Sequence, residues 1–394
     1  MTMMATTTNK GRVYLGRTLI AREGIPAVNF KDRFRHLYCL GKTQTGKSTF
    51  FLNLIKQELD GAIIILDPAG TFAEAVASLV PSERLVYVDE SHPLVINPLD
   101  RPLPKSKIAN DFVEVMNNCV TGTTPNVEAT VLMLEIIRNA LRVMPDNKRN
   151  IEYLADFLNY EHIRNTYRED KYWKHFDEKD SKGWYIYREK RESAQRVASR
   201  LSAFYLDESL RKFTIGKNEL DIKRIAEDKK IVCFDFKGMD NDLMVYLGNL
   251  VSTAVKSYYM QLKTTDCPPL FFYIDEFHLF VSPAFDNMLA ECAKFNISVN
   301  LSHHSFEQVN KKTLDIALGN CFTKVVFNCG YTEAERMAKE FQKKPEDFLN
   351  LKRFEAHALI GNDPHHILTF PPPKTEDYTP EKTFNFLRDD WIMV

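Results

Sequence analysis

Residues 41–49 constrain the fold of this chain more than any other stretch, because two glycines, a lysine and a serine stand there at fixed spacing. The apolar run 37–40 precedes them, and an apolar pattern of helical period begins at Phe50. This order predicts a strand, a phosphate-binding loop and a helix. The backbone N–H groups of such a loop and the N-terminus of the helix point at phosphate oxygens.

We expect this loop to form a site for ATP. Lys47 would reach the β- and γ-phosphates, and the Ser48 hydroxyl would bind Mg²⁺. A glycine-rich turn that binds nothing is the alternative, but the full pattern arises by chance in only roughly one chain in a hundred of this length. The expected nucleotide-binding residues are Gly41, Lys42, Thr43, Gln44, Thr45, Gly46, Lys47, Ser48 and Thr49.

Two further apolar runs end in acidic residues. The run 62–66 ends at Asp67, and the run 270–274 ends at Asp275 and Glu276. Continuous apolar runs of this length are typical of buried parallel strands, whose carboxyl ends line the ligand crevice of an α/β sheet. We expect Asp275 to hold the water shell of Mg²⁺ and Glu276 to polarise the attacking water. Asp67 is expected beside Mg²⁺-bound water, with a turn residue capping the helix from residue 71 as the alternative.

A polar segment, residues 302–305, follows the strand-like run 297–301. We expect His304 to sense the γ-phosphate and relay hydrolysis, with an ordinary loop histidine as the alternative. The adjacent His303 also invites a metal interpretation. No third ligand is suitably spaced nearby to complete such a site.

Strand-like runs alternate with helical patterns, which predicts a doubly wound α/β core with a mostly parallel sheet. Between residues 103 and 228 helical periodicity persists without a convincing strand, so an all-helical insert is expected there. The expected division is a lead and short hairpin over 1–30, the first half of the core over 31–102, the insert over 103–228, and the second half with a tail over 229–394.

Composition restricts the location and the partners of the chain. The net charge of −1 provides no global basic field, so any nucleic-acid contact must be local. Basic and aromatic residues interleave between residues 164 and 200, but the charges are mixed in sign and favour a solvated helical surface. Seven cysteines without a C-x-x-C pair fit a reducing, cytoplasmic location. We recognise neither a signal peptide nor a membrane span.

The order of these features resembles the HerA/FtsK superfamily of ring-shaped, DNA-pumping ATPases. The resemblance is greatest to the conjugative coupling proteins of type IV secretion and their HerA-like relatives. It rests on residues 32–36, 41–49, 66–70, 97–99, 273–277, 301–308, 319–320 and 334–336.

The resemblance implies a RecA-like P-loop core, ATP and Mg²⁺ as ligands, DNA as a partner and a homo-oligomer, expected to be a hexameric ring. The helical insert lies where coupling proteins carry their all-helical domain. The N-terminal membrane anchor usual in coupling proteins and the larger β-barrel of HerA are not recognised in this chain.

The chain departs from these relatives at several positions. Ala69 and Thr71 replace the polar residues that usually follow Asp-Pro, and His304 stands where relatives carry glutamine. Ala293 and Asn328 occupy two places where relatives carry an arginine. The arginine that a neighbouring subunit would lend to the γ-phosphate is therefore expected elsewhere. Arg336 is the first candidate, followed by Arg200 or Arg211, whereas Lys294 offers only a point charge.

The resemblance implies an ATP-driven DNA translocase that serves conjugative or mobile-element transfer. Lys311 and Lys312 are candidates for the DNA path, with a solvated helix start as the alternative. A viral-type packaging motor and a HerA-like repair or defence motor are the alternative functions, followed by an ATP-dependent assembly switch that does not translocate. A relaxase, a nuclease or a membrane channel would be the corresponding partner.

Overall fold

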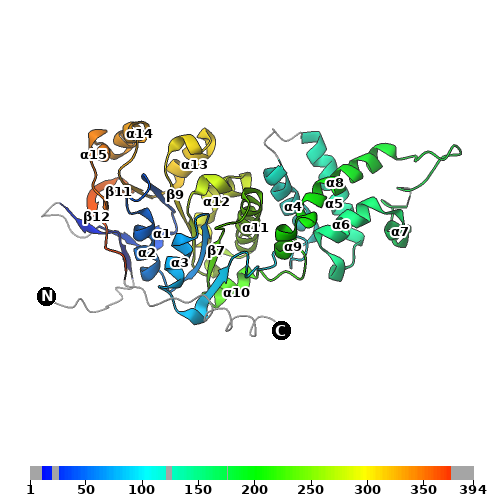
Figure 1. The fold of residues 1–394 in the computed structure, drawn as a ribbon, viewed down its shortest axis with the longest axis horizontal. Coiled ribbons are helices and arrows are strands. Elements are labelled where there is room, and N and C mark those ends of the chain that lie inside the picture. The colour runs from blue at the N-terminus through cyan, green and yellow to red at the C-terminus, as the bar shows by residue number, and fades with distance from the viewer. Residues whose placement is uncertain (1–10, 20–25, 121–126, 175, 374–394) are drawn as a thin grey trace. The chain divides into compact units, whose positions relative to one another are not determined.

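A computed structural model describes residues 11–19, 26–120, 127–174 and 176–373 (Figure 1). The chain divides into two compact units, which we describe separately. The core unit comprises the described parts of Met1–Asp89, Ile222–Gly238 and Tyr258–Val394, and the helical unit those of Glu90–Asp221 and Met239–Ser257. Within the described residues, no helix is both long and apolar enough to cross a membrane.

The core unit contains all the named strands. They are β1 (Arg12–Tyr14), β2 (Arg17–Thr18), β3 (Ala27–Asn29), β4 (Leu37–Leu40), β5 (Ala62–Asp67), β6 (Leu85–Val88), β7 (Ile231–Asp235), β8 (Leu270–Ile274), β9 (Ile297–His303), β10 (Thr323–Val326), β11 (Glu355–Ile360) and β12 (Asp363–Leu368). Its helices are α1 (Phe30–Arg33), α2 (Lys47–Gln57), α3 (Thr71–Ala77), α10 (Ile222–Glu227), α12 (Pro283–Glu291), α13 (Lys311–Asn320), α14 (Tyr331–Phe341) and α15 (Glu346–Leu349).

Ten strands form one sheet in the order β2-β12-β11-β10-β4-β9-β8-β5-β7-β6. The strands from β10 to β6 in this order are parallel, and β11, β12 and β2 continue the sheet antiparallel. The prediction of an α/β core with a mostly parallel sheet is therefore confirmed. β1 and β3 pair antiparallel as a separate small sheet.

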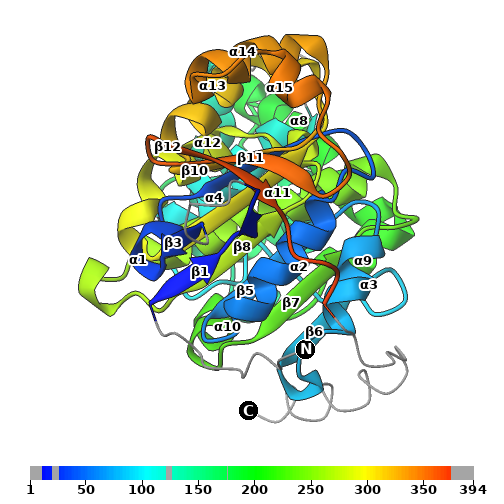
Figure 2. The same ribbon diagram turned by 90° about the vertical axis from the view of Figure 1, so that its left-hand side faces the viewer.

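Side chains on the strands alternate between the two faces of this sheet. One face, represented by Leu37 and Ile63, packs against α2, α3 and the small sheet. Figure 2 shows α2 and α3 in front of that face. On the other face Tyr38 packs against Phe277, which stacks on Phe285 of α12. Helices on both faces explain why β8 is apolar throughout and why β5 is apolar up to its final aspartate.

A buried ion pair links the start of the core to the sheet. Arg33 Nε donates to Glu58 Oε1 at 2.5 Å, and both side chains are fully buried. The Tyr273 hydroxyl donates to the other Glu58 oxygen, and Arg33 Nη2 donates to Asn300 Oδ1 at 2.7 Å. This network fixes α1 and the end of α2 against β8 and β9.

The helical unit consists of helices without a named strand among its described residues. They are α4 (Lys105–Val120), α5 (Val127–Val143), α6 (Ile151–Asn159), α7 (Glu161–Arg164), α8 (Arg188–Leu206), α9 (Glu208–Thr214) and α11 (Asn241–Tyr259). The sequence predicted a helical insert over residues 103–228, whereas the compact helical unit begins at Glu90 and takes in most of α11. Contacts within the unit explain this, since Tyr246 packs on Phe204 and Ser257 donates to Asp111 Oδ2.

The aromatic stretch of the helical unit serves partly as its core. Trp173 is 2% exposed and contacts Phe157 and Phe176, with ring centroids 4.8 Å apart in both pairs. Arg164, also buried, forms a two-point ion pair with Asp177. Packing thus explains a part of the mixed aromatic and charged pattern.

Candidate active site

The loop after β4 has the backbone that a phosphate cradle requires. Gln44 and Gly46 have φ values of 63° and 123°, and α2 begins directly afterwards at Lys47. A side chain at residue 41 would collide with Phe327, whose Cβ lies 2.7 Å from the position of the added carbon. The two loop glycines are therefore required by the fold as well as by the pattern. Ser48 is exposed in the first turn of α2, where a bound cation could reach it.

Lys47 points back into the loop. Its ammonium donates to the carbonyl oxygens of Gly41 at 2.6 Å and Lys42 at 3.2 Å, and it lies 2.8 Å from His304 Nδ1. Burial lowers the pKa of Lys47, with nearby acidic groups acting in the opposite direction. The ammonium is thus held at the centre of the loop by groups that phosphate oxygens can replace.

Asp275 directly follows β8. This strand pairs with β9, which in turn pairs with β4, the strand before the phosphate loop. Ser302 of β9 donates a hydrogen bond to Asp275 Oδ1. Burial raises the pKa of Asp275, and the Ser302 bond opposes that shift. This bond therefore fixes the orientation of the Asp275 carboxylate at the carboxyl ends of the parallel strands. A residue that holds a metal-bound water requires such a fixed orientation. Ser302 belongs to the predicted polar segment 302–305, and the pairing of β8 with β9 identifies its contact with Asp275.

Glu276 adopts a left-handed backbone conformation, with φ 47° and ψ 50°. Such a conformation in a residue with a side chain costs about 1–3 kcal/mol, and it is found mainly where function requires it. Its carboxylate Oε1 lies 2.6 Å from His304 Nε2, and Oε2 lies 3.4 Å from His278 Nδ1. The strained backbone therefore turns the carboxylate toward the segment after β9.

His304 connects the two halves of the site. When the ring is neutral, Nε2–H donates to Glu276 and Nδ1 accepts from Lys47. When the ring is protonated, Nδ1–H donates to the Gly41 carbonyl oxygen, 3.0 Å away. The hydrogen bond to Glu276 raises the pKa of His304 and exceeds the opposing effect of burial. His304 therefore lies between the phosphate loop and the proposed base, and its role as a sensor of the γ-phosphate remains a prediction.

The adjacent His303 has a different role. It is fully buried, its Nε2 bonds to the Tyr38 hydroxyl, and its ring packs on Phe277. Burial lowers the pKa of His303 to about 3, so the ring is neutral. No group of three or more potential metal-ligating side chains occurs among residues 11–19, 26–120, 127–174 and 176–373. The structure thus gives no support to a metal site at the histidine pair.

Asp67 is fully buried at the end of β5. Its carboxylate accepts backbone N–H groups of Ala69, Phe72 and Ala73 at 2.8–2.9 Å. Burial raises the pKa of Asp67 to about 6, and these bonds oppose the shift. This is the capping role considered as the alternative for Asp67. Its contact with metal-bound water remains a prediction.

Glu333, which the sequence did not indicate, supports the segment after β9. Its Oε1 accepts the Ser305 hydroxyl at 2.9 Å and the Phe306 N–H at 3.0 Å. Gln308 Oε1 accepts the N–H of Ser305 at 3.0 Å. These contacts join the His304 segment to the start of α14. No local signal identifies Glu333, because it lies on a different element.

The candidate arginines have different surroundings. Arg336 on α14 is 37% exposed, pairs with Asp315 at 2.7 Å and lies over the Phe306 ring. Arg211 forms a two-point ion pair with Glu152 within the helical unit. Arg200 is exposed on α8. Arg336 is thus the candidate within the core unit, beside the segment that carries His304.

Asn328 and Ala293 occupy the two positions at which the resemblance implies an arginine. Asn328 Nδ2 donates to the carbonyl oxygens of Leu349 at 2.6 Å and Leu351 at 3.3 Å. Ala293 lies in a short helical turn before β9.

Lys311 and Lys312 are exposed at the start of α13 and border an open concavity with Asp315, Ile316 and Asn320. Lys312 lies 3.4 Å from Asp286.

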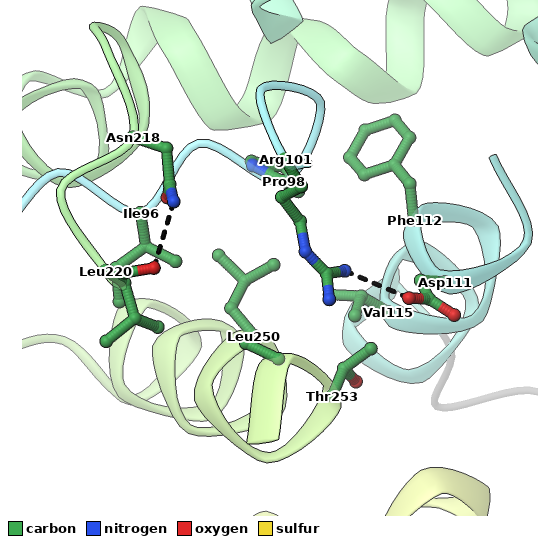
Figure 3. A pocket seen from close by; sticks show the side chains of 11 residues that line it. Ile96, Pro98, Arg101, Asp111, Phe112, Val115, Asn218, Leu220, Leu250 and Thr253 are labelled. Carbon is green, nitrogen blue, oxygen red and sulfur yellow. Dashed lines mark hydrogen bonds and ion pairs between the residues drawn. The ribbon is translucent and has the colours of Figure 1, made fainter. Parts of the chain in front are cut away.

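The helical unit contains a small cavity that is not part of this site (Figure 3). It has a volume of about 20 Å³, which is sufficient for one water molecule. Arg101 borders it and donates to Asp111 Oδ2 at 3.0 Å. None of the residues expected to bind nucleotide lines this cavity. The cavity is therefore separate from the candidate active site.

Solved structures share this fold. The bacterial conjugative coupling protein TrwBdeltaN70, in its unbound monoclinic form, is 13% identical with a TM-score of 0.68, and the match covers 94% of this chain and 96% of that chain. The plasmid coupling protein TrwB in complex with ADP and Mg²⁺ is 14% identical with a TM-score of 0.70, covering 95% and 93%. VirB4 of Thermoanaerobacter pseudethanolicus is 15% identical with a TM-score of 0.64, covering 93% and 98%.

These likenesses confirm the RecA-like P-loop fold expected from the resemblance. No curated protein sequence matches the chain. The family model described as the central domain of helicase HerA matches residues 13–255, which is more than half of the chain. The match includes the phosphate loop and most of the helical unit. The protein therefore belongs to the HerA helicase central-domain family.

Proposed function

We propose that this protein is an ATP-driven DNA translocase that moves DNA in conjugative or mobile-element transfer. One observation carries the proposal: His304 bonds both to Lys47, for the phosphates, and to Glu276, for the attacking water. The shared fold of TrwB, a conjugative coupling protein, supports this function. TrwB complexes with a non-hydrolysable ATP analogue and with ADP and Mg²⁺ support ATP and Mg²⁺ as ligands.

In the proposed reaction Lys47 exchanges its loop carbonyl partners for β- and γ-phosphate oxygens. Glu276 takes a proton from the water that attacks the γ-phosphorus, and the bond to the β–γ bridging oxygen breaks to give ADP and phosphate. The Ser48 hydroxyl and Asp275 would hold Mg²⁺, which supplies positive charge against the phosphates when bound. His304 orients the Glu276 carboxylate and senses whether Lys47 has moved.

A DNA-stimulated ATPase assay, beside negative-stain imaging with ATP and DNA, tests the motor and the ring together. We expect turnover to rise with DNA and the particles to form closed rings, which the resemblance indicates are homohexamers. An ATP turnover rate that does not change when DNA is added would instead favour an ATP-dependent assembly switch that does not translocate.

The biological task is tested by the neighbouring genes. Relaxase and channel genes would support conjugation, capsid genes packaging, and a nuclease gene repair or defence. The six described cysteines are free thiols, which supports a reducing, cytoplasmic location for the motor.

Arg336 is our candidate for the arginine lent to the neighbouring subunit. Its exposed position beside the His304 segment supports this role. An arginine of this kind contributes about 10³–10⁵ in rate, so Arg336→Ala should abolish most turnover without weakening ATP binding. Mixing Arg336→Ala with Lys47→Ala protein should restore activity, because some interfaces then contain both groups. Normal turnover by Arg336→Ala alone would direct the search to Arg200 or Arg211.

Lys311 and Lys312 are our candidates for the DNA path. Both are exposed at a helix start, and each phosphate contact releases counterions, so binding should weaken steeply with salt. The Lys311→Ala/Lys312→Ala variant should show a smaller salt slope, and the control Lys343→Ala/Lys344→Ala should not. Equal slopes in both variants would remove the first pair from the path.

A further inference from the structure

A segment on the far side of the phosphate loop has no role in the reaction described above. It runs from Leu349 to Phe354 and leads into β11. Phe354 has φ 70°, a left-handed conformation that is unusual for a bulky side chain. The strain costs about 1–3 kcal/mol and persists only where surrounding contacts require it.

Phe354 holds the phosphate loop directly. Its backbone N–H donates to the Thr45 carbonyl oxygen at 2.8 Å. Its ring lies against Gly46, since a side-chain carbon added at Gly46 would be 2.8 Å from Phe354 Cδ1. The Phe354 carbonyl oxygen in turn accepts the N–H and the hydroxyl of Thr369 at 2.9 and 3.0 Å.

A second connection joins the same segment to the loop. Asn328 Nδ2 donates to the carbonyl oxygens of Leu349 and Leu351, while the Asn328 carbonyl oxygen accepts the Lys42 N–H at 2.8 Å. The segment is thus fixed to both ends of the phosphate loop. Its exposed member Arg353 places its guanidinium 4.7 Å from the centre of the Phe354 ring. Within the described residues no ion pair of Arg353 occurs.

The sheet order indicates which part of a nucleotide would reach this segment. Glu276 and His304 follow β8 and β9, on one side of the loop strand β4, whereas Phe354 precedes β11, two strands away on the other side. Because β11 is antiparallel, its start lies at the same edge as the ends of the parallel strands. A triphosphate whose γ end points toward Glu276 therefore directs its nucleoside toward β10 and β11.

We propose that Arg353, backed by the Phe354 ring, binds the nucleoside part of the nucleotide by stacking its planar guanidinium on the base. A guanidinium stacks well on flat aromatic groups, and Phe354 fixes the orientation of its inner face. Phe354 is a positioning residue that supports both the arginine and the Thr45–Gly46 turn. The inference rests on the proposed ATP site and adds its nucleoside contact.

Calorimetric binding of MgATP and of magnesium tripolyphosphate tests the proposal, because tripolyphosphate has the phosphates but no nucleoside. Arg353→Ala should raise the Kd for ATP about five- to fiftyfold and leave the Kd for tripolyphosphate within about twofold. In turnover assays KM should rise with little change in kcat, as expected for lost uniform binding. Arg35→Ala is the matched control, since Arg35 also stacks on a phenylalanine, Phe322, but at the opposite ends of the strands.

Phe354→Tyr should bind both ligands like the native protein, whereas Phe354→Ala should weaken both by loosening the loop. An equal loss of both ligands in Arg353→Ala would mean a phosphate contact and would overturn the nucleoside assignment. Unchanged binding of both would also overturn it. If the native protein binds neither ligand, the proposed function itself fails, and this inference fails with it.

Discussion

Replacing Glu276 by glutamine removes the proposed proton acceptor and leaves the shape of the site nearly intact. The glutamine oxygen can still accept from His304 Nε2, which lies 2.6 Å from the native carboxylate oxygen. Neither side chain is β-branched, so the left-handed backbone at φ 47° is equally tolerable. We expect ATP binding to be unchanged and turnover to fall about 10²–10⁴-fold. This corresponds to about 3–5 kcal/mol in the activation barrier.

The same contact predicts how His304 contributes. Loss of a charge-assisted hydrogen bond is worth about 1.5–3 kcal/mol, so His304→Ala should slow turnover about ten- to a hundredfold. If His304 acts by orienting Glu276, the double variant Glu276→Gln/His304→Ala should be little slower than Glu276→Gln alone. His304→Gln should retain more activity than His304→Ala, because an amide can bond to the same neighbours.

Single-turnover phosphate release measures these rates, and calorimetry with ATP measures binding. Glu307→Gln is the matched control, because Glu307 is exposed on the same segment and its side chain makes no contact with the site in the described structure. Additive losses in the double variant would refute the orienting role of His304. Normal turnover by Glu276→Gln would mean that another group activates the water.

Three further predictions concern binding and stability. Lys47→Ala should abolish ATP binding or turnover, because its ammonium occupies the centre of the loop; activity in a folded variant would contradict the nucleotide site. Glu58→Ala should destabilise the core unit by about 3–5 kcal/mol in denaturant unfolding, since Arg33 would remain buried and unpaired; a loss under 1 kcal/mol would contradict this. Burial lowers the pKa values of His36 and His357 to about 4, below the ordinary 6.5. As the pH falls, these histidines therefore take up protons in the unfolded chain before they do so in the folded chain. The free energy of unfolding should consequently be about 2 kcal/mol per histidine lower at pH 5 than above pH 6.5; equal unfolding midpoints at pH 7 and 5 would contradict it.

The phosphate loop and the acidic strand end were predictable because each is a local pattern. Residues 41–49 need only their own glycines and the flanking strand and helix to form the cradle. The run ending at Asp275 needs only continuous burial to identify it as a central strand. Strand and helix periodicity likewise predicted the mostly parallel sheet, since hydrophobic period follows directly from backbone geometry.

The order of the strands in the sheet was not predictable in this way, and it determines the contacts of the site. His304 meets Glu276 because β9 lies between β4 and β8. Phe354 meets Thr45 because β11 returns antiparallel beside β10. A local pattern specifies which element a residue belongs to, whereas its partner depends on the packing of distant segments, which only the tertiary structure decides.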